Sequence, residues 1–260
     1  MQFQHSAQLR AAYPDLVAGV VLATGITSTA DVAQRIAAHT AVARDRLAIG
    51  SESGFPEIQA WRRAYAAMGL RPTRYRCAAE ALLRRLRLDD ELPRLHPLVD
   101  LCNAVSAAYA IPVAALDLDR VDGDLVVRPA HGDEEYLSFA GGTEHPDPGE
   151  VTFVDAAGRA HARRWTNRQS GWSAVRAGTS SVLIVAEALH PDAEADVTRL
   201  VTTLVAELTE AWSAPTRAAV LTDAAPPFDA TPRFDATARF DARAAGGADG
   251  QAVSPGTRWR

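Results

Sequence analysis

The chain has 260 residues, 47% of them hydrophobic, and a formal net charge of −5. A chain of this length and composition can bury a substantial core, in one large domain or two small ones. The mild acidity argues against non-specific binding to nucleic acid, so we expect no DNA partner, but it allows a local basic patch. The sequence contains no lysine, so an anion-binding surface would present the planar, bidentate donors of arginine.

The first half of the chain predicts a strand followed by helices. The run 16–23, LVAGVVLA, is rich in valine and predicts a buried strand. We expect one helix to open at Ser28 and a second at Pro56, which Gly69 would close. Residues 77–88 predict a third helix.

Residues 96–119, HPLVDLCNAVSAAYAIPVAALDLD, predict a helix that leads directly into a strand. Apolar residues recur at helical spacing along the first half: Leu98, Leu101, Cys102, Val105 and Tyr109. Pro112 ends the helical pattern, and residues 111–118 are typical of a strand. Asn103 lies away from the apolar stripe, so it is either a functional site residue or a helix-surface or structural amide.

The second half predicts short strands and then one long helix. Strands are expected at five segments: 125–128, 135–139, 150–155, 160–165 and 180–188. The last segment, SSVLIVAEA, is the most hydrophobic, so we expect it to be central, with Glu187 at its end. Residues 192–212 have the apolar periodicity of a long helix with one buried face.

Beyond Pro215 the composition changes to Pro, Gly, Ala and Thr around a short repeat. Phe-Asp-Ala recurs every six residues, beginning at Phe228, Phe234 and Phe240. Three such copies are too short for a solenoid, and the composition predicts a disordered tail. Its phenylalanines are either docking points that recruit a partner to a scaffold or the result of neutral repeat expansion.

No segment has the pattern of a targeting signal or of a membrane span. The N-terminus lacks a basic region followed by an apolar one, and no apolar run approaches the roughly 18 residues that cross a membrane. Cys77 and Cys102 have neither CxxC nor Cys/His ligand spacing, which favours buried free thiols in a reducing compartment. We therefore expect a cytoplasmic protein with no membrane partner.

Common catalytic and cofactor motifs are absent, but one polar segment stands out. The chain has no GxGxxG, HExxH or GxSxG, so we expect no cofactor and no metal site. Residues 163–168, RRWTNR, concentrate three arginines, an indole and an amide. On a strand, Arg163 and Trp165 would share a face opposite to Arg164. Arginine near an aromatic ring suits a phosphate beside a stacked base, or an aminoacyl ester. The alternative is an edge strand with solvated arginines.

An ordered series of segments resembles the B3/B4 domain of the bacterial phenylalanyl-tRNA synthetase β subunit. The series comprises 96–119, 125–158 (LVVRPAHGDEEYLSFAGGTEHPDPGEVTFVDAAG) and 179–189 (TSSVLIVAEAL). The chain also resembles stand-alone B3/B4 proteins, which share the preceding segment 56–88. The resemblance spans 16–212 and implies an α+β fold, with a mixed or antiparallel sheet flanked by helices. We interpret 1–95 as the N-terminal part of one globular unit, 96–213 as the B3/B4 core and 214–260 as the tail.

The resemblance also implies a site, although this sequence departs from the family pattern. In the synthetase the domain hydrolyses tyrosine that has been wrongly attached to phenylalanine tRNA. Asn103 falls on the asparagine of the family's helix motif, and Asp117 on the aspartate that closes its second motif. Ala114 stands where the family has an editing histidine, and Val185 where it has a recognition glutamate. Glu187 lies two residues further on the same strand face and could substitute.

The function implied is tRNA binding, with trans-editing hydrolysis of mischarged aminoacyl-tRNA as its enzymatic form. Amino-acid activation with ATP cannot reside here, since nothing resembles a class II catalytic core. We expect Glu187 and Asn103 to act in catalysis. We expect the substrate to be held by a polar group comprising Arg163, Arg164, Trp165, Asn167 and Arg168. The alternative, motivated by Ala114, is a non-catalytic binder of a free amino acid or small metabolite in the same cleft.

Overall fold

The computed structural model describes residues 1–223 and 225–232. The α-helices are α1 (Ala7–Ala12), α2 (Ala33–Ile49), α3 (Pro56–Ala67), α4 (Ala78–Asp89), α5 (Pro97–Tyr109) and α6 (Ala193–Trp212), and the 3-10 helices are η1 (Glu52–Gly54) and η2 (Leu118–Arg120). The strands are β1 (Gln2–His5), β2 (Val17–Thr24), β3 (Val113–Asp117), β4 (Leu125–Pro129), β5 (Glu135–Leu137), β6 (Thr143–Glu144), β7 (Val151–Val154), β8 (Arg159–Ala160), β9 (Ala162–Arg163), β10 (Arg168–Gln169), β11 (Ser181–Ala188), β12 (Thr216–Leu221) and β13 (Phe228–Asp229).

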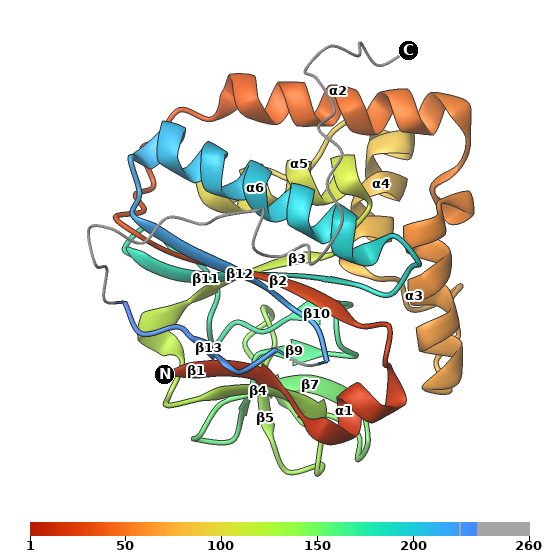
Figure 1. Ribbon diagram of the computed structural model, residues 1–260, viewed down its shortest axis with the longest axis vertical. Helices are drawn as coiled ribbons and strands as arrows, with labels where there is room; N and C mark the ends of the chain where they lie inside the picture. Colours follow the sequence, from red (N-terminus) through yellow and green to blue (C-terminus); the bar gives the residue numbers. More distant parts are fainter. Residues whose placement is uncertain (224, 233–260) are drawn as a thin grey trace.

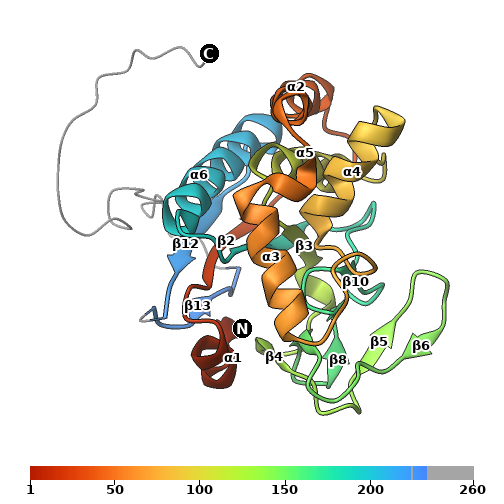
Figure 2. The ribbon, with the colours of Figure 1, turned by 90° about the vertical axis from the view of Figure 1, so that its right-hand side faces the viewer.

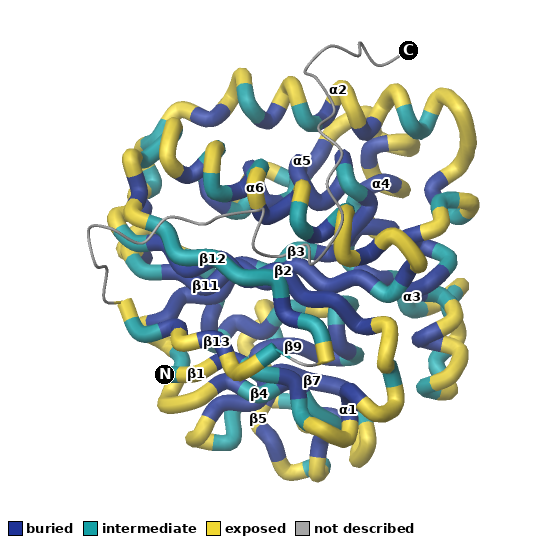
Figure 3. The backbone as a smooth tube through the Cα atoms, viewed as in Figure 1, coloured by how far each residue is buried: buried dark blue, intermediate teal, exposed yellow. Residues whose placement is uncertain are grey.

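A four-stranded antiparallel sheet, in the order β12-β2-β11-β3, forms the middle of the molecule. The apolar strand β11 lies between β2 and β3, so the prediction that 180–188 is central is confirmed. Strands β2 and β11, the two longest, are buried over nearly their whole length (Figure 3). This explains their continuous apolar sequences, because both faces of the sheet are covered.

Helices cover one face of this sheet. The long helix α6 packs on β2, β12 and β11, α5 packs on β3, and α2 lies on the outer side of α5 (Figure 1). The approach of α6 to β2 depends on Gly19, where a Cβ atom would lie only 2.8 Å from Val197 Cγ1. A side chain on this strand residue would therefore push the helix away from the sheet.

A second, mixed sheet covers the other face, in the order β13-β1-β4-β7-β8-β5-β6. Strand β1 runs parallel to β4, and β5 runs parallel to β8, while the remaining neighbours are antiparallel. A short β9–β10 hairpin lies between the two sheets (Figures 1 and 2). Helices on one side and mixed and antiparallel strands on the other confirm the α+β fold class.

Two element boundaries differ from the expectation. The helix predicted to open at Ser28 begins at Ala33, where the carboxylate of Asp31 accepts a hydrogen bond from the Ala33 amide at 3.0 Å. Residues 160–165 do not form one strand. Strand β9 ends at Arg163, and the next two residues, Arg164 and Trp165, adopt left-handed backbone angles with φ of 49° and 60°.

The chain beyond Pro215 differs from the expected disordered tail in the residues that can be described. Strand β12 pairs with β2 at one edge of the central sheet, and β13 pairs with β1 at one edge of the second sheet. The first Phe-Asp-Ala copy supplies β13, with Phe228 opposite Phe3. The copies at Phe234 and Phe240 lie outside the described residues.

Within residues 1–223 and 225–232, no helix combines the length and apolarity needed to span a bilayer. Cys77 and Cys102 are buried free thiols, as predicted. Burial raises the pKa of each thiol to about 12.

Candidate functional site

A cavity of about 70 Å³ lies between the central sheet and the strands that face it. One wall comes from β3 and β11, and the opposite wall from β7 and the β9–β10 hairpin. Most of the lining is apolar, with a few polar side chains: His161, Thr166, Asn167, Arg168, Gln169 and Glu187. This volume holds several water molecules, and so admits a small group of a ligand.

The register of β3 and β11 places three sequence-predicted positions on one wall. Ala114 pairs directly with Val185 across the antiparallel ladder, and both line the cavity. Glu187 lies two residues beyond Val185 and lines the same cavity. The expectation that Glu187 shares the Val185 face is therefore confirmed, because side chains two apart on a strand point the same way. Asp117 is not among the lining residues and instead accepts a hydrogen bond from the Thr179 hydroxyl at 2.7 Å.

Glu187 is 2% exposed and is held by two donors. His5 Nε2 lies 2.7 Å from Glu187 Oε1, and the indole Nε1 of Trp165 donates to the same oxygen at 3.0 Å. Among the described residues, the second oxygen, Oε2, has no hydrogen-bond partner. The carboxylate is thus fixed through one oxygen, and the other is left for a ligand or water.

Arg10 determines which nitrogen of His5 carries the proton. Its guanidinium Nη2 lies 3.1 Å from His5 Nδ1, and its Nη1 donates to the Leu16 carbonyl at 2.6 Å. Because a guanidinium can only donate, Nδ1 must be the acceptor, and the proton must lie on Nε2, facing Glu187. Burial lowers the pKa of Arg10, although the negative charge of Glu187 opposes this shift. Arg10, His5 and Glu187 therefore form one buried, directional chain.

The turn after β9 carries Trp165 into this network. Left-handed angles at two successive non-glycine residues cost about 1–2 kcal/mol each. The turn is held by the Arg164 amide, which donates to Glu150 Oε1 at 2.7 Å, and by the Trp165 amide, which donates to the Val151 carbonyl at 2.7 Å. The buried Trp165 ring packs edge-on against Tyr13 and against the Trp61 indole. Backbone strain is offset here by interactions that aim the indole N–H at Glu187.

His161 also lines the cavity, and its ring nitrogens are occupied. Nε2 lies 3.1 Å from Asp155 Oδ2, and Nδ1 lies 2.8 Å from the Ser173 hydroxyl. Burial opposes ionisation of Asp155, but hydrogen bonds from His161 and from backbone amides outweigh burial and lower the pKa of Asp155. The order Ser-His-Asp is that of a nucleophilic triad, yet Ser173 is fully buried and does not line the cavity. The group supports the cavity wall.

Arg163, one of the expected substrate-binding residues, is already bonded to carboxylates of the protein itself. Its guanidinium makes two hydrogen bonds to Glu150, at 2.6 and 3.0 Å, and one to Glu144 at 2.9 Å. Burial opposes the charge on Arg163, but these carboxylates outweigh burial and raise its pKa. Arg163 does not line the cavity, so it has no free donors there for a phosphate.

The other expected residues are divided between the cavity and its surroundings. Trp165, Asn167 and Arg168 line the cavity. Arg164 lies outside it, with its guanidinium carbon 4.5 Å from the centre of the Tyr75 ring. Asn103 is half-buried on α5 and is not among the lining residues. The structure therefore brings Glu187 to the cavity with three of the five expected substrate-binding residues, without Asn103.

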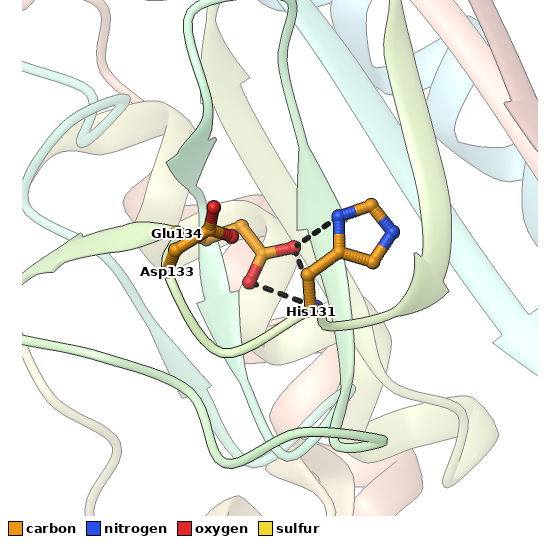
Figure 4. Close-up of side chains that lie close together, drawn as sticks. All are labelled: His131, Asp133 and Glu134. Atoms are coloured by element: carbon orange, nitrogen blue, oxygen red, sulfur yellow. Dashed lines mark hydrogen bonds and ion pairs between the residues drawn. The ribbon is translucent and has the colours of Figure 1, made fainter.

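A group of metal-ligand type occurs in the loop 131–134 (Figure 4), and none of its residues lines the cavity. It consists of His131, Asp133 and the buried Glu134. Both oxygens of Glu134 are already bonded by the amides of His131 and Gly132, and Arg128 donates to Oε1 at 2.6 Å. Through these bonds the carboxylate organises the loop.

Sequence reasoning missed His5, Arg10 and His161. His5 and Glu187 are 182 residues apart, and no local pattern around either residue indicates the other. The contact exists because β1 lies in the second sheet and faces the end of β11 in the first.

The fold and the cavity define an α+β domain with a carboxylate-bearing pocket between two sheets. The B3/4 domain family matches residues 60–204, more than half of the chain, and the chain belongs to this family. A search of curated proteins found no match to this chain. Among solved structures, an N-terminal fragment of the phenylalanyl-tRNA synthetase β-subunit from Pyrococcus horikoshii is similar, with a TM-score of 0.44 and 9% identity. The match covers 83% of this chain and 50% of that fragment, so the chain corresponds to half of the fragment's length.

Proposed function

We propose that this chain binds aminoacyl-tRNA, holds the aminoacyl group in the cavity, and hydrolyses the ester that links it to the tRNA. The observation that carries the proposal is Glu187, a buried carboxylate on the wall of a mostly apolar cavity. Its orientation is set by His5 and Trp165, and one oxygen has no partner among the described residues. A carboxylate in this position is suited to act as a general base.

In the proposed reaction, a water molecule in the cavity attacks the ester carbonyl carbon. Glu187 Oε2 accepts a proton from this water as the new carbon–oxygen bond forms. The ester bond to the terminal ribose then breaks, and the ribose oxygen takes up the proton, which restores the carboxylate. The products are the free amino acid and uncharged tRNA, and no protein nucleophile or cofactor takes part.

Residues of the β9–β10 hairpin would orient the substrate. The amide nitrogen of Asn167 donates to the Arg76 carbonyl at 2.7 Å, which leaves its side-chain oxygen as an acceptor in the cavity lining. Arg168 is exposed at the rim and lies 3.5 Å from Glu144, a weak pairing that a phosphate could replace. Asn103 lies elsewhere and has no part in the proposal.

The test is release of amino acid from a panel of correctly charged and mischarged tRNAs, with tyrosine on phenylalanine tRNA as the first substrate. We expect release above the buffer rate for at least one mischarged tRNA. No release above buffer for any member of the panel would exclude the enzymatic form of the proposal.

The engagement of Arg163 by Glu150 and Glu144 favours a second candidate, a non-catalytic binder of a free amino acid or small metabolite. Ala114 in place of an editing histidine points the same way. The two candidates differ in their salt dependence, because phosphate contacts make affinity fall steeply as salt rises. Affinity for an amino acid that is independent of salt, with no affinity for tRNA, would favour the second candidate.

A further inference from the structure

Two segments far apart in the sequence meet beside the mouth of the cavity: the loop 70–77 between α3 and α4, and the turn 164–167. The Ala78 amide donates to the Thr166 carbonyl at 2.8 Å, and the Asn167 amide nitrogen donates to the Arg76 carbonyl at 2.7 Å. Figure 2 shows this loop passing beside β10. Because Ala78 and Asn167 both line the cavity, whatever leaves it on this side must cross the junction of the two segments.

An aromatic ring and two guanidinium groups occupy this junction. The guanidinium carbon of Arg164 lies 4.5 Å from the centre of the Tyr75 ring, and that of Arg74 lies 5.2 Å from it. We call Arg74, Tyr75 and Arg164 the arginine–tyrosine cluster. Arg74 is exposed, and the other two residues are half-buried. Contact with a ring restricts a guanidinium, so less conformational entropy is lost when it binds an anion.

The cluster also differs in its electrostatics from most arginines in the described part of the chain. Most of those pair with a carboxylate, for example Arg46 with Glu57, Arg62 with Glu80, Arg87 with Glu52 and Arg163 with Glu150. In the described part of the chain, neither Arg74 nor Arg164 forms an ion pair with a carboxylate. Two positive charges are therefore available at the cavity mouth of a protein whose formal net charge is −5.

We propose that the arginine–tyrosine cluster binds the phosphodiester backbone of the single-stranded 3′ end of a tRNA whose terminal residue enters the cavity. Guanidinium groups beside an aromatic ring suit phosphates and stacked bases of single-stranded nucleic acid. Arg164 immediately precedes Trp165, which bonds Glu187 inside the cavity, so the cluster and the carboxylate are joined through one turn. This inference rests on the proposed function and identifies the surface by which the nucleic acid is held.

The experiment measures the affinity of the full chain for two probes, an uncharged tRNA and the same tRNA lacking its single-stranded 3′ end. The variant is Arg74→Gln with Arg164→Gln. The matched control is Arg84→Gln with Arg94→Gln, which removes the same charge from two exposed arginines further along the chain. Thermal unfolding of every variant checks that the fold is retained.

We expect the cluster variant to bind intact tRNA about 10-fold more weakly than wild type, with a salt slope smaller by roughly one to two. The control pair should retain nearly wild-type affinity, and truncated tRNA should bind both variants alike. Equal weakening by both double variants, unchanged affinity of the cluster variant, or no tRNA binding by wild type would each overturn the inference.

The outcome is separable from that of the proposed function. Glu187→Gln should lose hydrolysis and retain tRNA affinity, whereas the cluster variant should lose affinity. Hydrolysis that depends on Glu187, together with an affinity unaffected by the cluster variant, would overturn this inference and leave the proposed function standing.

Discussion

His5 Nε2 lies 2.7 Å from Glu187 Oε1, and this contact joins the first strand of one sheet to the end of the central strand of the other. Both side chains are buried, with exposed fractions of 0% and 2%. The contact therefore does two things, since it ties the sheets together and orients the carboxylate of the candidate site.

Replacing His5 should destabilise the protein measurably. In His5→Ala the Glu187 carboxylate would stay buried with Trp165 as its remaining donor, and an unsatisfied buried polar group costs about 1–3 kcal/mol. We expect the free energy of unfolding in urea to fall by that amount. The control is His39→Ala, since His39 and Glu207 form a similar pair that is partly exposed and should contribute less than about 1 kcal/mol. Equal losses in both variants would contradict this account.

A substitution at the end of α6 should stabilise the protein. Ser213 terminates the helix with φ of 51°, is exposed, and needs a left-handed conformation that glycine adopts without cost. Ser213→Gly should therefore raise the free energy of unfolding by about 1 kcal/mol. Ser213→Ala keeps the Cβ atom, so it should change stability little. A gain in the alanine variant equal to that in the glycine variant would rule out backbone strain as the cause.

The loop carboxylate of Glu134 should make stability depend on pH. Burial alone would raise its pKa, but the amides of His131 and Gly132 and the Arg128 guanidinium outweigh burial and lower the pKa to about 2. A group whose pKa is lower in the folded state stabilises the protein above its unfolded pKa, and this contribution is lost as pH falls toward the folded value.

Glu134→Gln should thus be less stable than wild type by about 2–3 kcal/mol at pH 7. The difference should shrink as pH falls from about 5 to about 2. Urea unfolding at several pH values measures it, and a difference that is constant with pH would contradict the assignment.

The two thiols should be inert in the native protein. Burial raises the pKa of Cys77 and of Cys102 to about 12, and both side chains are almost fully buried. Because the thiolate is the reactive form, an aromatic disulfide reagent at pH 8 should label neither cysteine until a denaturant unfolds the chain. Rapid labelling of either thiol under native conditions would show that its surroundings open far more readily than the structure implies.

The elements with strong local periodicity were predictable from the sequence. The apolar run now seen as β11 was expected to be central, and the helices α3, α4, α5 and α6 fall close to their predicted ranges. The strand β12 was not predicted, because Thr216–Leu221 is stabilised by pairing with β2, almost 200 residues earlier. Local composition after Pro215 carries no signal of that partner.

The candidate site was only partly predictable, again because local sequence patterns do not reveal contacts between distant segments. The two-residue step from Val185 to Glu187 follows from strand geometry alone, and it was correct. The alternation of side-chain faces predicted for a strand over 160–165 was wrong from Arg164 onward. Arg164 and Trp165 adopt left-handed backbone angles, which sequence patterns do not reveal for non-glycine residues. The place of Arg163 in an ion-pair cluster depends on Glu144 and Glu150, which come from other parts of the second sheet and its loops.

The most direct test of the central claim compares ester hydrolysis by wild type and by Glu187→Gln, with the exposed Glu135→Gln as control. Each full-length protein is incubated at excess enzyme with a mischarged tRNA that wild type hydrolyses, and the released amino acid is counted over time. If Glu187 is the general base, Glu187→Gln should react about 100-fold or more slowly while tRNA affinity and thermal stability are retained. The control should match wild type. Hydrolysis by a folded Glu187→Gln variant at the wild-type rate would contradict the account.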